Sequence, residues 1–574
     1  MLFAPPEAAA WLDALRASTL AEATAQKRQA EEQWRKPLTE RLANGRAIGN
    51  LRILRQEKHK ILFELVSPDV HPCFLREGDF VRLSRNDPFL PAARLILAGE
   101  DHEGIHAHIW NGGPTPGEAD LWTLDSDHID LTDRYLDALD SLALSPRLLA
   151  VLMGDAEAET DLDLDSECRD DLEDGPFNPS QVDAVANCVA ARDAFLVQGP
   201  PGTGKTRVLA EVADRLLDRV ETLLVTGPTH RAINHALSAI RKVIGGKARV
   251  VKIGFSPPGA TGDFESFENY AESGLAENRE PHVVGATPFA LWSKNTGLYS
   301  ARFDTILLDE ASQITPVQAA MSMLRGERWL FFGDDKQLAP VLLTGHDTPL
   351  RARSVFGLLR DRDMEVMLEE SYRLSDTLAE WPSATFYGGR LKGKHERRLH
   401  LGGPDPSREL LPEPSFAVLR ESSPGCSVKN EEEASRVQEL VARLVAGGVH
   451  AEEIGVVTPF RAQAGHIRRL LRLAFPEGGW RSVTVDTVER FQGQEREVMI
   501  VAMTASDPVF IDRLADFLFQ PERLNVAVTR ARLKTVMLVP EELAVHANRL
   551  ADGGHEGAII FCSRIKDTTA PWPS

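Results

Sequence analysis

The stretch that constrains this chain most is Gln198–Leu209, "QGPPGTGKTRVL". It fits the spacing G-x-x-x-x-G-K-[ST], with an apolar run, "AFLV", before it and an amphipathic helical pattern after it. Glycines at this spacing let backbone N–H groups turn toward phosphate oxygens, and the following helix presents its positive end to the same anion. A strand, a glycine-rich loop and a helix in this order predict an α/β domain that binds phosphate groups.

Two side chains of this loop suit a nucleoside triphosphate with its metal. Lys205 can reach the β- and γ-phosphates, and Thr206 offers a hydroxyl to Mg²⁺. We therefore expect ATP and Mg²⁺ as ligands. The loop residues expected to bind ATP are Gly199, Gly202, Thr203, Gly204, Lys205 and Thr206. The loop alone does not separate ATP-driven switches, kinases, transporters and motors.

Length and composition exclude several classes of protein. A chain of 574 residues should hold about three to four domains, and 43% hydrophobic with 26% charged residues is typical of a globular protein. No apolar run is long enough to span a bilayer, and no basic n-region precedes an apolar core at the N-terminus. Scattered cysteines without a C-x-x-C pair disfavour a zinc ribbon, an iron–sulfur site and a disulfide framework, so we expect a cytoplasmic protein. These cysteines are Cys73, Cys168, Cys188, Cys426 and Cys562.

The net charge of −20 is unevenly distributed along the chain. Residues 155–174 hold eleven acidic residues and one arginine, which is typical of a solvated linker. Basic clusters occur at Gly389–Arg398, at His466–Arg472 and around Arg241–Arg249, and each is more typical of a solvated face than of a binding track. Because a binding groove needs only local positive charge, the net charge does not exclude a nucleic-acid partner.

Hydrophobic patterning divides the chain into β-rich, helical and α/β parts. Residues 18–44 read as a polar helix interrupted by Pro37, and residues 130–153 return to helix. Between them, about 47–125, short β-rich runs separated by turn residues predict a small β-barrel. Apolar strands and amphipathic helices then alternate in two successive sets, which predicts two parallel-sheet α/β domains. Only the first set has a phosphate loop, and this is the layout of a two-lobed motor.

The expected segments follow from these patterns. They are an N-terminal helical stalk (1–45), a β-barrel (46–128), a stalk helix with an acidic linker (129–176), a first α/β domain (177–345) with a short helical insert at about 243–282, a second α/β domain (346–545) and a C-terminal tail (546–574).

Acidic and amide residues at the ends of two further strand candidates suit ATP hydrolysis. Asp309 and Glu310 end the strand "TILLDEASQI", where an Asp can hold Mg²⁺ through water and a Glu can polarise the attacking water. In "WLFFGDDKQLAPV", Gln337 could sense the γ-phosphate or orient water. The alternative for the acidic pair is an exposed loop, but the apolar run before it favours a catalytic role.

These stretches, in this order, resemble the ATPase motifs of superfamily 1 helicases. The remaining motifs occur in family order: "FNPSQVDAV", "TGPTHRAINHAL", "VVGATP", "LEESYRLSDTLAEW", "IGVVTPFRAQ", "VTVDTVERFQGQE" and "ERLNVAVTRAR". The "DEASQ" and "VDTVERFQGQE" variants match the Upf-like branch, and the resemblance covers nearly the whole chain. Departures are Ala339 where the family often has proline, and His230 and His235 where relatives carry other polar residues. No Cys/His-rich zinc domain or nuclease signature is found, which is typical of the helicase core alone.

The resemblance implies a fold and roles for further ATP-site residues. It implies two tandem RecA-like parallel-sheet domains and a β-barrel carried on helical stalk arms. Gln181 and Tyr372 are expected against the adenine, and Glu495 near the ribose. Arg373 and Arg530 are expected to reach the γ-phosphate from the second lobe when ATP closes the two lobes.

The resemblance also implies a single-stranded DNA or RNA partner crossing both lobes, with movement from 5′ to 3′ by a monomer. The expected contacts are short polar residues at strand ends, which suit phosphate binding without sequence preference. They are Pro228, Thr229, Asn234 and Thr287 in the first lobe and Thr458, Pro459 and Thr487 in the second. For the threonines the alternative is capping of local backbone.

Three functions remain to be weighed. The first is an ATP-dependent helicase or translocase, and the second is a nucleic-acid-stimulated ATPase that clamps or remodels a complex without unwinding. The third is a P-loop switch without a nucleic-acid partner, which the paired arginines and the motifs of the second lobe disfavour. The sequence does not choose between DNA and RNA.

Overall fold

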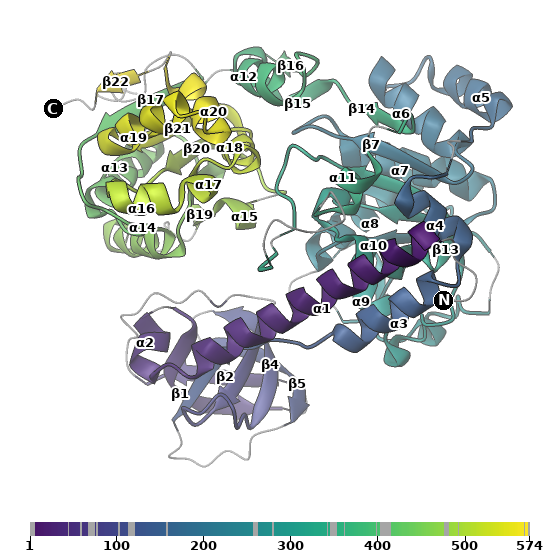
Figure 1. Ribbon diagram of the computed structural model, residues 1–574, viewed down its shortest axis with the longest axis horizontal. Helices are drawn as coiled ribbons and strands as arrows, with labels where there is room; N and C mark the ends of the chain where they lie inside the picture. The colour runs from purple at the N-terminus through teal and green to yellow at the C-terminus, as the bar shows by residue number, and fades with distance from the viewer. Residues whose placement is uncertain are drawn as a thin grey trace. The chain divides into compact units, whose positions relative to one another are not determined.

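Figure 1 shows the computed structural model with its helices and strands labelled. It describes residues 6–43, 45–57, 60–66, 75, 79–100, 104–112, 121–156, 159–255, 262–277, 280–340, 342–344, 353–360, 362–395, 397, 399–401, 415–475, 482–491, 493–566 and 569–571.

The N-terminal β-rich region forms a closed barrel, as predicted. Its strands are β1 (Ala47–Gln56), β2 (Lys60–Leu65), β3 (Phe80–Ser84), β4 (Ala93–Glu100), β5 (Ile105–Gly112) and β6 (Trp122–Ser126), closed in the order β1-β2-β5-β4-β3-β6. Alternate side chains point inward, so that Leu51, Phe63, Leu83, Leu95 and Leu124 fill a buried core.

Two helices precede the barrel in the sequence, α1 (Pro6–Trp34) and α2 (Leu38–Ala43), and two follow it, α3 (Thr132–Leu142) and α4 (Pro146–Met153). Pro37 separates α1 from α2, as its missing N–H predicts. At 1.5 Å per residue α1 is about 44 Å long, and it packs along α3 (Figure 1). Trp34 joins α1 to the barrel, because its indole N–H donates to the Ser126 carbonyl at 2.9 Å and the Arg82 guanidinium lies 3.7 Å from its ring centre.

The central part of the acidic run, residues 162–172, is a helix and not a linker. It forms α5 (Leu162–Leu172), capped by the Asp161 carboxylate, and it packs on α6 (Pro179–Ala190). Cys168 and Leu172, four residues apart, are buried. The composition concealed this apolar stripe, because acidic residues surround it; Asp163 and Asp165 of the first turn suit the positive end of the helix.

The first α/β domain has an eight-stranded sheet in the order β10-β9-β11-β8-β12-β13-β7-β14, with every neighbouring pair parallel. The strands are β7 (Ala194–Gln198), β8 (Thr222–Thr226), β9 (Arg249–Ile253), β10 (Glu265–Phe267), β11 (His282–Gly285), β12 (Phe303–Leu308), β13 (Gly326–Gly333) and β14 (Glu365–Met367). The helices are α7 (Lys205–Asp218), α8 (His230–Ile244), α9 (Pro288–Leu291), α10 (Pro316–Met323) and α11 (Val355–Leu359), with 3₁₀ turns at Tyr270–Ser273, Lys294–Thr296 and Ala311–Gln313. The segment at about 243–282, expected to be a helical insert, instead supplies β9 and β10 to the sheet.

The second α/β domain has a six-stranded sheet in the order β19-β18-β20-β21-β17-β22 and a separate pair, β15 with β16. The strands are β15 (Glu370–Ser375), β16 (Lys392–His395), β17 (Phe416–Glu421), β18 (Ile454–Thr458), β19 (Thr484–Thr487), β20 (Arg496–Ala502), β21 (Ala531–Pro540) and β22 (Thr569–Pro571). The helices are α12 (Asp376–Phe386), α13 (Glu431–Ala446), α14 (Arg461–Ala474), α15 (Val488–Phe491), α16 (Pro508–Arg513), α17 (Ala515–Leu518), α18 (Pro521–Val528), α19 (Glu541–Asp552) and α20 (Glu556–Ile565), with a 3₁₀ turn at Ala451–Glu453.

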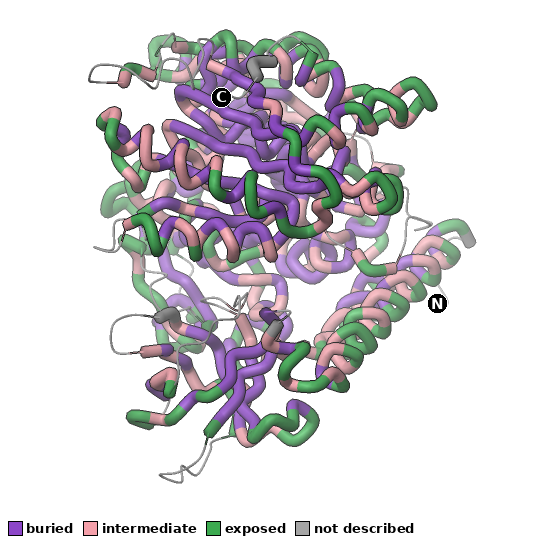
Figure 2. The backbone as a smooth tube through the Cα atoms, turned by 90° about the vertical axis from the view of Figure 1, so that its left-hand side faces the viewer, coloured by how far each residue is buried: buried purple, intermediate pink, exposed green. Residues whose placement is uncertain are grey.

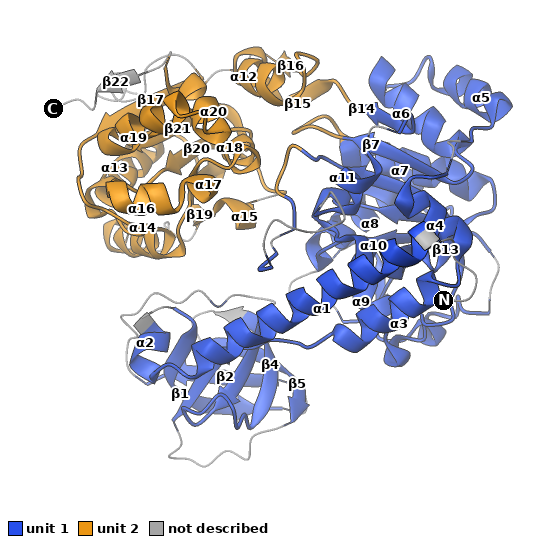
Figure 3. Ribbon diagram, in the orientation of Figure 1, with its two compact units in different colours: residues 1–198, 205–335, 339–367 blue, residues 199–204, 336–338, 368–574 orange. Residues whose placement is uncertain are grey.

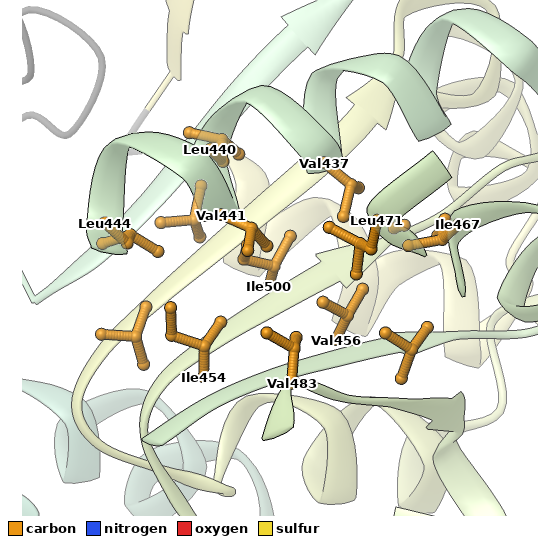
Figure 4. Packing of buried hydrophobic residues seen from close by; sticks show 14 of the residues in the cluster. Val437, Leu440, Val441, Leu444, Ile454, Val456, Ile467, Leu471, Val483 and Ile500 are labelled. Carbon is orange, nitrogen blue, oxygen red and sulfur yellow. The ribbon is translucent and has the colours of Figure 1, made fainter. Parts of the chain in front are cut away.

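The core of the second domain lies between helices and sheet. Figure 4 shows Val441 and Leu444 of α13, Ile467 of α14 and Val456 of β18 packed together. The segment expected to be a C-terminal tail contributes α20 and β22, and β22 pairs with β17. Apolar residues on one face of α20 explain why this segment joins the fold.

Contacts between residues group the chain into two compact units (Figure 3). Unit 1 holds residues 1–198, 205–335 and 339–367, and unit 2 holds residues 199–204, 336–338 and 368–574. The sheets are buried and their outer helices alternate between buried and exposed positions (Figure 2). This arrangement confirms the α/β class with an added β-barrel. Among the described residues no helix has the length and apolar character needed to cross a membrane.

Candidate functional site

The strand order of unit 1 divides one edge of its sheet between two sets of motifs. The neighbouring strands β12 and β13 end directly before Asp309 and Asp334, and β7 leads into the phosphate loop. The neighbouring strands β8 and β11 end shortly before Thr229 and Thr287. Because all these strands are parallel, their carboxyl ends meet at the same edge, where α/β sheets bind ligands. The motifs expected to bind ATP and the motifs expected to bind nucleic acid therefore lie in two adjacent halves of this edge.

The shape of the phosphate loop depends on left-handed glycines and on contacts with β15, which lies in unit 2 together with loop residues 199–204. Gly202 and Gly204 have φ of 76° and 82°, which side chains with a Cβ rarely adopt. A Cβ on Gly202 would lie 2.3 Å from the Cβ of Arg373. The Ser371 hydroxyl donates to the Pro201 carbonyl at 2.7 Å, and the Tyr372 N–H donates to the Gly202 carbonyl at 2.8 Å. The loop is thus held by the same segment that carries Arg373.

Lys205 lies against the two acidic residues that follow β12. Its Nζ donates to Glu310 Oε1 at 2.9 Å and lies 3.6 Å from Asp309 Oδ1. Burial opposes the charge of Lys205, but Glu310 and Asp309 outweigh it and raise the pKa of the ammonium. Burial and the like charge of Glu310 raise the pKa of Asp309, and Lys205 offsets part of this rise. The three residues therefore form one buried, interacting cluster.

Glu310 has a strained backbone. Its φ of 52° is in the left-handed region, which is costly for a residue with a Cβ and recurs at functional sites. Gln313 Nε2 donates to Glu310 Oε2 at 3.1 Å, which fixes the side chain. Thr206 lies in the first turn of α7, and Asp309 is 2% exposed. A hydroxyl and a carboxylate are the oxygen ligands that Mg²⁺ accepts, so these residues fit the ion.

In unit 2, two arginines meet residues of other motifs. Arg530 is 2% exposed, and its guanidinium donates to Gln337 Oε1 at 2.6 Å. Arg373 Nε donates to Glu495 Oε2 at 2.5 Å. Burial raises the pKa of Glu495, but Arg373 and Arg532 outweigh it and lower the pKa overall. Gln337, Arg373, Glu495 and Arg530, far apart in sequence, are therefore linked in pairs within unit 2.

The residues expected at the adenine have different surroundings. Gln181 is fully buried in α6, where its side-chain oxygen accepts the Asn178 N–H at 3.2 Å in a capping box. Tyr372 is 49% exposed at β15, so its ring can receive a flat ligand.

In unit 1, the polar residues that are expected to contact nucleic acid also have capping roles. Thr229 accepts the Ala232 N–H and Thr287 accepts the Ala290 N–H, each at 3.2 Å, so both threonines cap helices. Thr229 is exposed, whereas Pro228 and Thr287 are half-buried. The Asn234 side-chain oxygen accepts a hydrogen bond from Lys252 Nζ at 2.6 Å.

In unit 2, Thr458 and Thr487 end the neighbouring strands β18 and β19 and lie opposite each other in the register. Thr458 and Pro459 are both buried. The Thr458 hydroxyl lies 2.9 Å from the Thr504 hydroxyl. Thr504 has a φ of 66° and is held by Glu433, whose Oε1 accepts the Thr504 N–H at 2.7 Å. The Thr458 side chain thus points into a buried network.

The sequence reasoning missed Ser371, Lys252, Glu433 and Thr504. Lys252 gave one usable signal, because a lysine within the apolar run "RVVKIG" falls on a buried strand. Ser371 and Thr504 gave no signal, since their roles depend on contacts with distant segments.

Comparisons with known proteins agree with this arrangement of motifs. Two family models, each described as an AAA domain, match the chain, one over residues 176–269 and 266–345 and the other over residues 352–542. Regulator of nonsense transcripts 1 of Caenorhabditis elegans is 29% identical over 450 residues, which are 70% of this chain and 41% of that protein. ATP-dependent helicase NAM7 of Saccharomyces cerevisiae is 26% identical over 408 residues, 63% of this chain and 41% of that protein.

A third relative is DNA replication ATP-dependent helicase/nuclease dna2 of Schizosaccharomyces pombe, 26% identical over 417 residues, 64% of this chain and 28% of that protein. The chain therefore spans less than half the length of these three relatives. Among solved structures, the arterivirus nonstructural protein 10 helicase with DNA aligns with a TM-score of 0.39 and 14% identity, covering 85% of this chain and 78% of that one.

Proposed function

Since the chain belongs to the Upf-like branch of superfamily 1 helicases, we propose that it is an ATP-dependent translocase or helicase on single-stranded DNA or RNA. The observation that carries the proposal is the divided sheet edge of unit 1. Residues suited to phosphoryl transfer follow β12, β13 and β7, and residues suited to a nucleic-acid backbone follow β8 and β11. One rigid sheet can thus couple the two ligands.

In the ATP half, we assign the charge of Lys205 to the β- and γ-phosphates and the carboxylate of Glu310 to the attacking water. The contact between Lys205 and Glu310 has to give way when ATP binds, because the phosphates then take the ammonium. Thr206 and Asp309 would hold Mg²⁺, which supplies positive charge to the phosphate oxygens. The strained Glu310 backbone supports its role, since such strain persists where surrounding structure fixes a side chain for function.

Arg373 and Arg530 supply further positive charge from unit 2 in this proposal. Both are tied to residues of the ATP motifs in unit 2, Arg530 to Gln337 and Arg373 to Glu495. An arginine that stabilises the charge of the transition state can change turnover by several orders of magnitude. ATP would then favour a closed arrangement of the two units, and hydrolysis would release it.

The barrel and its stalk are proposed to act on the nucleic acid. Arg134 of α3 donates to the Phe289 carbonyl at 3.0 Å, two residues after Thr287. The Glu22 carboxylate of α1 accepts the Leu343 and Thr344 N–H groups at 2.9 Å, in the segment that follows Gln337. The stalk therefore contacts segments adjacent to both halves of the edge. On the barrel, a cavity of about 290 Å³ is lined by Arg55, Glu57, Lys60, His106 and His108 among others, and Arg55 is paired with Glu57 at 3.6 Å.

The experiment that tests the proposal is the ATPase rate without nucleic acid and with single-stranded DNA or RNA of the same length and base sequence. We expect stimulation by at least one of the two, and the ratio reports the preferred strand. No stimulation by either would contradict the proposal and favour a P-loop switch. Displacement of a labelled strand from a tailed duplex then separates a helicase from an ATPase clamp that remodels without unwinding.

A further inference from the structure

Phe255, two residues after the end of β9 in unit 1, keeps a large aromatic side chain partly in contact with solvent. The residue is 40% exposed, although full burial of an aromatic ring is among the larger stabilising contributions that a side chain makes. Single exposed apolar residues are common on protein surfaces, so the surroundings of Phe255 decide whether its exposure has a meaning.

Phe255 lies at the edge of the sheet that carries the residues expected to contact nucleic acid. The strands β9 and β11 are parallel neighbours, and Gly254 and Thr287 each follow the last pair of their register by two residues. A Cβ on Gly254 would lie 3.3 Å from the Cβ of Ala290. The N–H of Ala290 donates to the Thr287 hydroxyl at 3.2 Å. The chain therefore leaves β9 directly beside the helix that Thr287 caps, and Phe255 is the next residue.

Phe255 also packs against the first residue of α8, His230. The centres of the two rings lie 5.9 Å apart and their planes are at 76°, which is the edge-to-face arrangement that aromatic rings favour. Burial, together with the charge of Lys252, lowers the pKa of His230 to about 4, so this imidazole is neutral at physiological pH. The residue before His230 is Thr229, which is exposed and caps α8. Phe255 is thus adjacent to the segments that carry Thr229 and Thr287.

A partly exposed aromatic ring in this position suits a nucleobase. Proteins that bind single strands without sequence preference combine groups that follow the phosphates with aromatic rings on which bases stack. The residues already expected to contact nucleic acid in unit 1 have no aromatic ring, so they do not supply the second kind of contact. They are Pro228, Thr229, Asn234 and Thr287.

We propose that Phe255 is a base-binding residue, on whose ring one base of the bound single strand stacks. The inference rests on the proposed function and adds a contact with the bases to the expected contacts with the backbone. The packing of Phe255 against His230 restricts the ring before the nucleic acid binds, which lowers the entropic cost of ordering it. Because every base has a flat π face, the contact tolerates any base sequence.

The test compares Phe255→Leu, Phe255→Tyr and a matched control, Tyr299→Ala. Leucine keeps an apolar side chain without a ring, whereas tyrosine keeps the ring. Tyr299 is 44% exposed, much like Phe255, but it lies shortly before β12 begins and therefore at the opposite edge of the sheet. Anisotropy without nucleotide measures the affinity of each protein for two labelled strands of equal length, an ordinary oligonucleotide and a sugar-phosphate chain that lacks all bases.

Phe255→Leu should bind the ordinary oligonucleotide at least about fivefold more weakly than the parent, which is the lower end of what one stack of a base on an aromatic ring contributes. Its affinity for the chain without bases should stay within about twofold of the parent, because the phosphate contacts are intact. Phe255→Tyr should stay within about twofold for both strands, since tyrosine offers the same flat ring. Tyr299→Ala should bind both strands as the parent does.

The chain without bases separates stacking from a merely structural role. If Phe255 only maintained the shape of this edge, its replacement would weaken the binding of both strands equally. A second measurement needs no variant and is independent of any effect on folding. The parent is irradiated with an oligonucleotide that carries 5-iodouracil, a base analogue that forms crosslinks with aromatic side chains stacked on it. We expect a crosslinked peptide that contains Phe255.

Four results would overturn the inference alone while the parent still binds the ordinary oligonucleotide. They are unchanged affinity in Phe255→Leu, an equal loss for both strands, a loss in Phe255→Tyr equal to that in Phe255→Leu, and crosslinks confined to other residues. If the parent neither binds an oligonucleotide nor shows stimulated ATPase, the proposed function and the inference both fail.

Discussion

Replacing Glu310 with glutamine separates the chemical step from ATP binding most sharply. Glu310 Oε1 accepts Lys205 Nζ at 2.9 Å and Oε2 accepts Gln313 Nε2 at 3.1 Å. A glutamine keeps the shape and one acceptor, so it loses one of these hydrogen bonds, and the upper bound on that loss is about 1.5–3 kcal/mol for a bond to a charged group. Removal of a like charge beside Asp309 offsets part of this cost. We therefore expect the melting temperature to fall by a few degrees at most.

The expected loss of turnover is larger than this structural effect. A general base contributes about 10²–10⁴-fold, or about 3–5 kcal/mol of barrier. Glu310→Gln should therefore lower turnover by at least about 10²-fold, while fluorescent-nucleotide titration shows affinity equal to or tighter than that of the parent, because Lys205 is released from its carboxylate partner. Lys205→Ala should weaken binding and hydrolysis together.

The matched control is Gln313→Ala, which removes the amide that contacts Glu310 but keeps the carboxylate. Its turnover should stay within about tenfold of the parent, since only the positioning hydrogen bond is lost. Hydrolysis by Glu310→Gln at the parent rate, measured by phosphate release with and without strand, would refute the assignment of the base.

Further predictions concern unit 2, the barrel and pH. Arg373→Ala and Arg530→Ala should each lower turnover by about 10³-fold or more, with little change in oligonucleotide affinity measured without nucleotide; normal turnover in both would contradict closure of the two units. Residues 47–125 can be deleted where the chain ends already meet, because the Ser126 N–H donates to the Arg46 carbonyl at 3.0 Å. This deletion should leave basal ATPase measurable and reduce nucleic-acid affinity or unwinding. Undiminished unwinding would contradict the role proposed for the barrel. The intact protein should open duplexes with a 5′ single-stranded tail, and a preference for a 3′ tail would argue against the proposed direction. Burial, with Glu421 nearby, raises the pKa of Glu433 to about 8, so this group binds its proton more tightly in the folded state. Its contribution to stability should therefore fall as pH rises from about 4.5 to about 8. Denaturant unfolding across this range should show a weaker fall in stability for Glu433→Gln than for the parent, and parallel curves would contradict the raised pKa of Glu433.

Local sequence was sufficient for the elements whose residues interact with their neighbours in the chain. The runs "AFLV", "TILL" and "WLFF" are apolar because their strands are buried on both faces, and each predicted strand is present. Gly202 and Gly204 allow the left-handed turns of the phosphate loop. The alternating runs of the barrel likewise predicted its strands. Period and spacing carry this information because it depends on a few consecutive residues.

Composition misled where one face of a helix, or the edge of a sheet, carried the information. Residues 155–174 are acidic on average, yet Cys168 and Leu172 bury one stripe of α5. The short strands β9 and β10 join an existing sheet edge, and β22 is stabilised by pairing with β17. Such segments are too short to be stable alone, so only a distant partner decides their structure.

The sequence by itself determined the sheet class, the phosphate loop and the order of the motifs. Tertiary structure decided which of these residues meet: Ser371 with the phosphate loop, Arg530 with Gln337, and Lys252 with Asn234. These contacts join residues that are 170, 193 and 18 positions apart. The physical reason is that side chains on neighbouring parallel strands and on the helices above them are brought together by strand order and register, and a single sequence does not state that order.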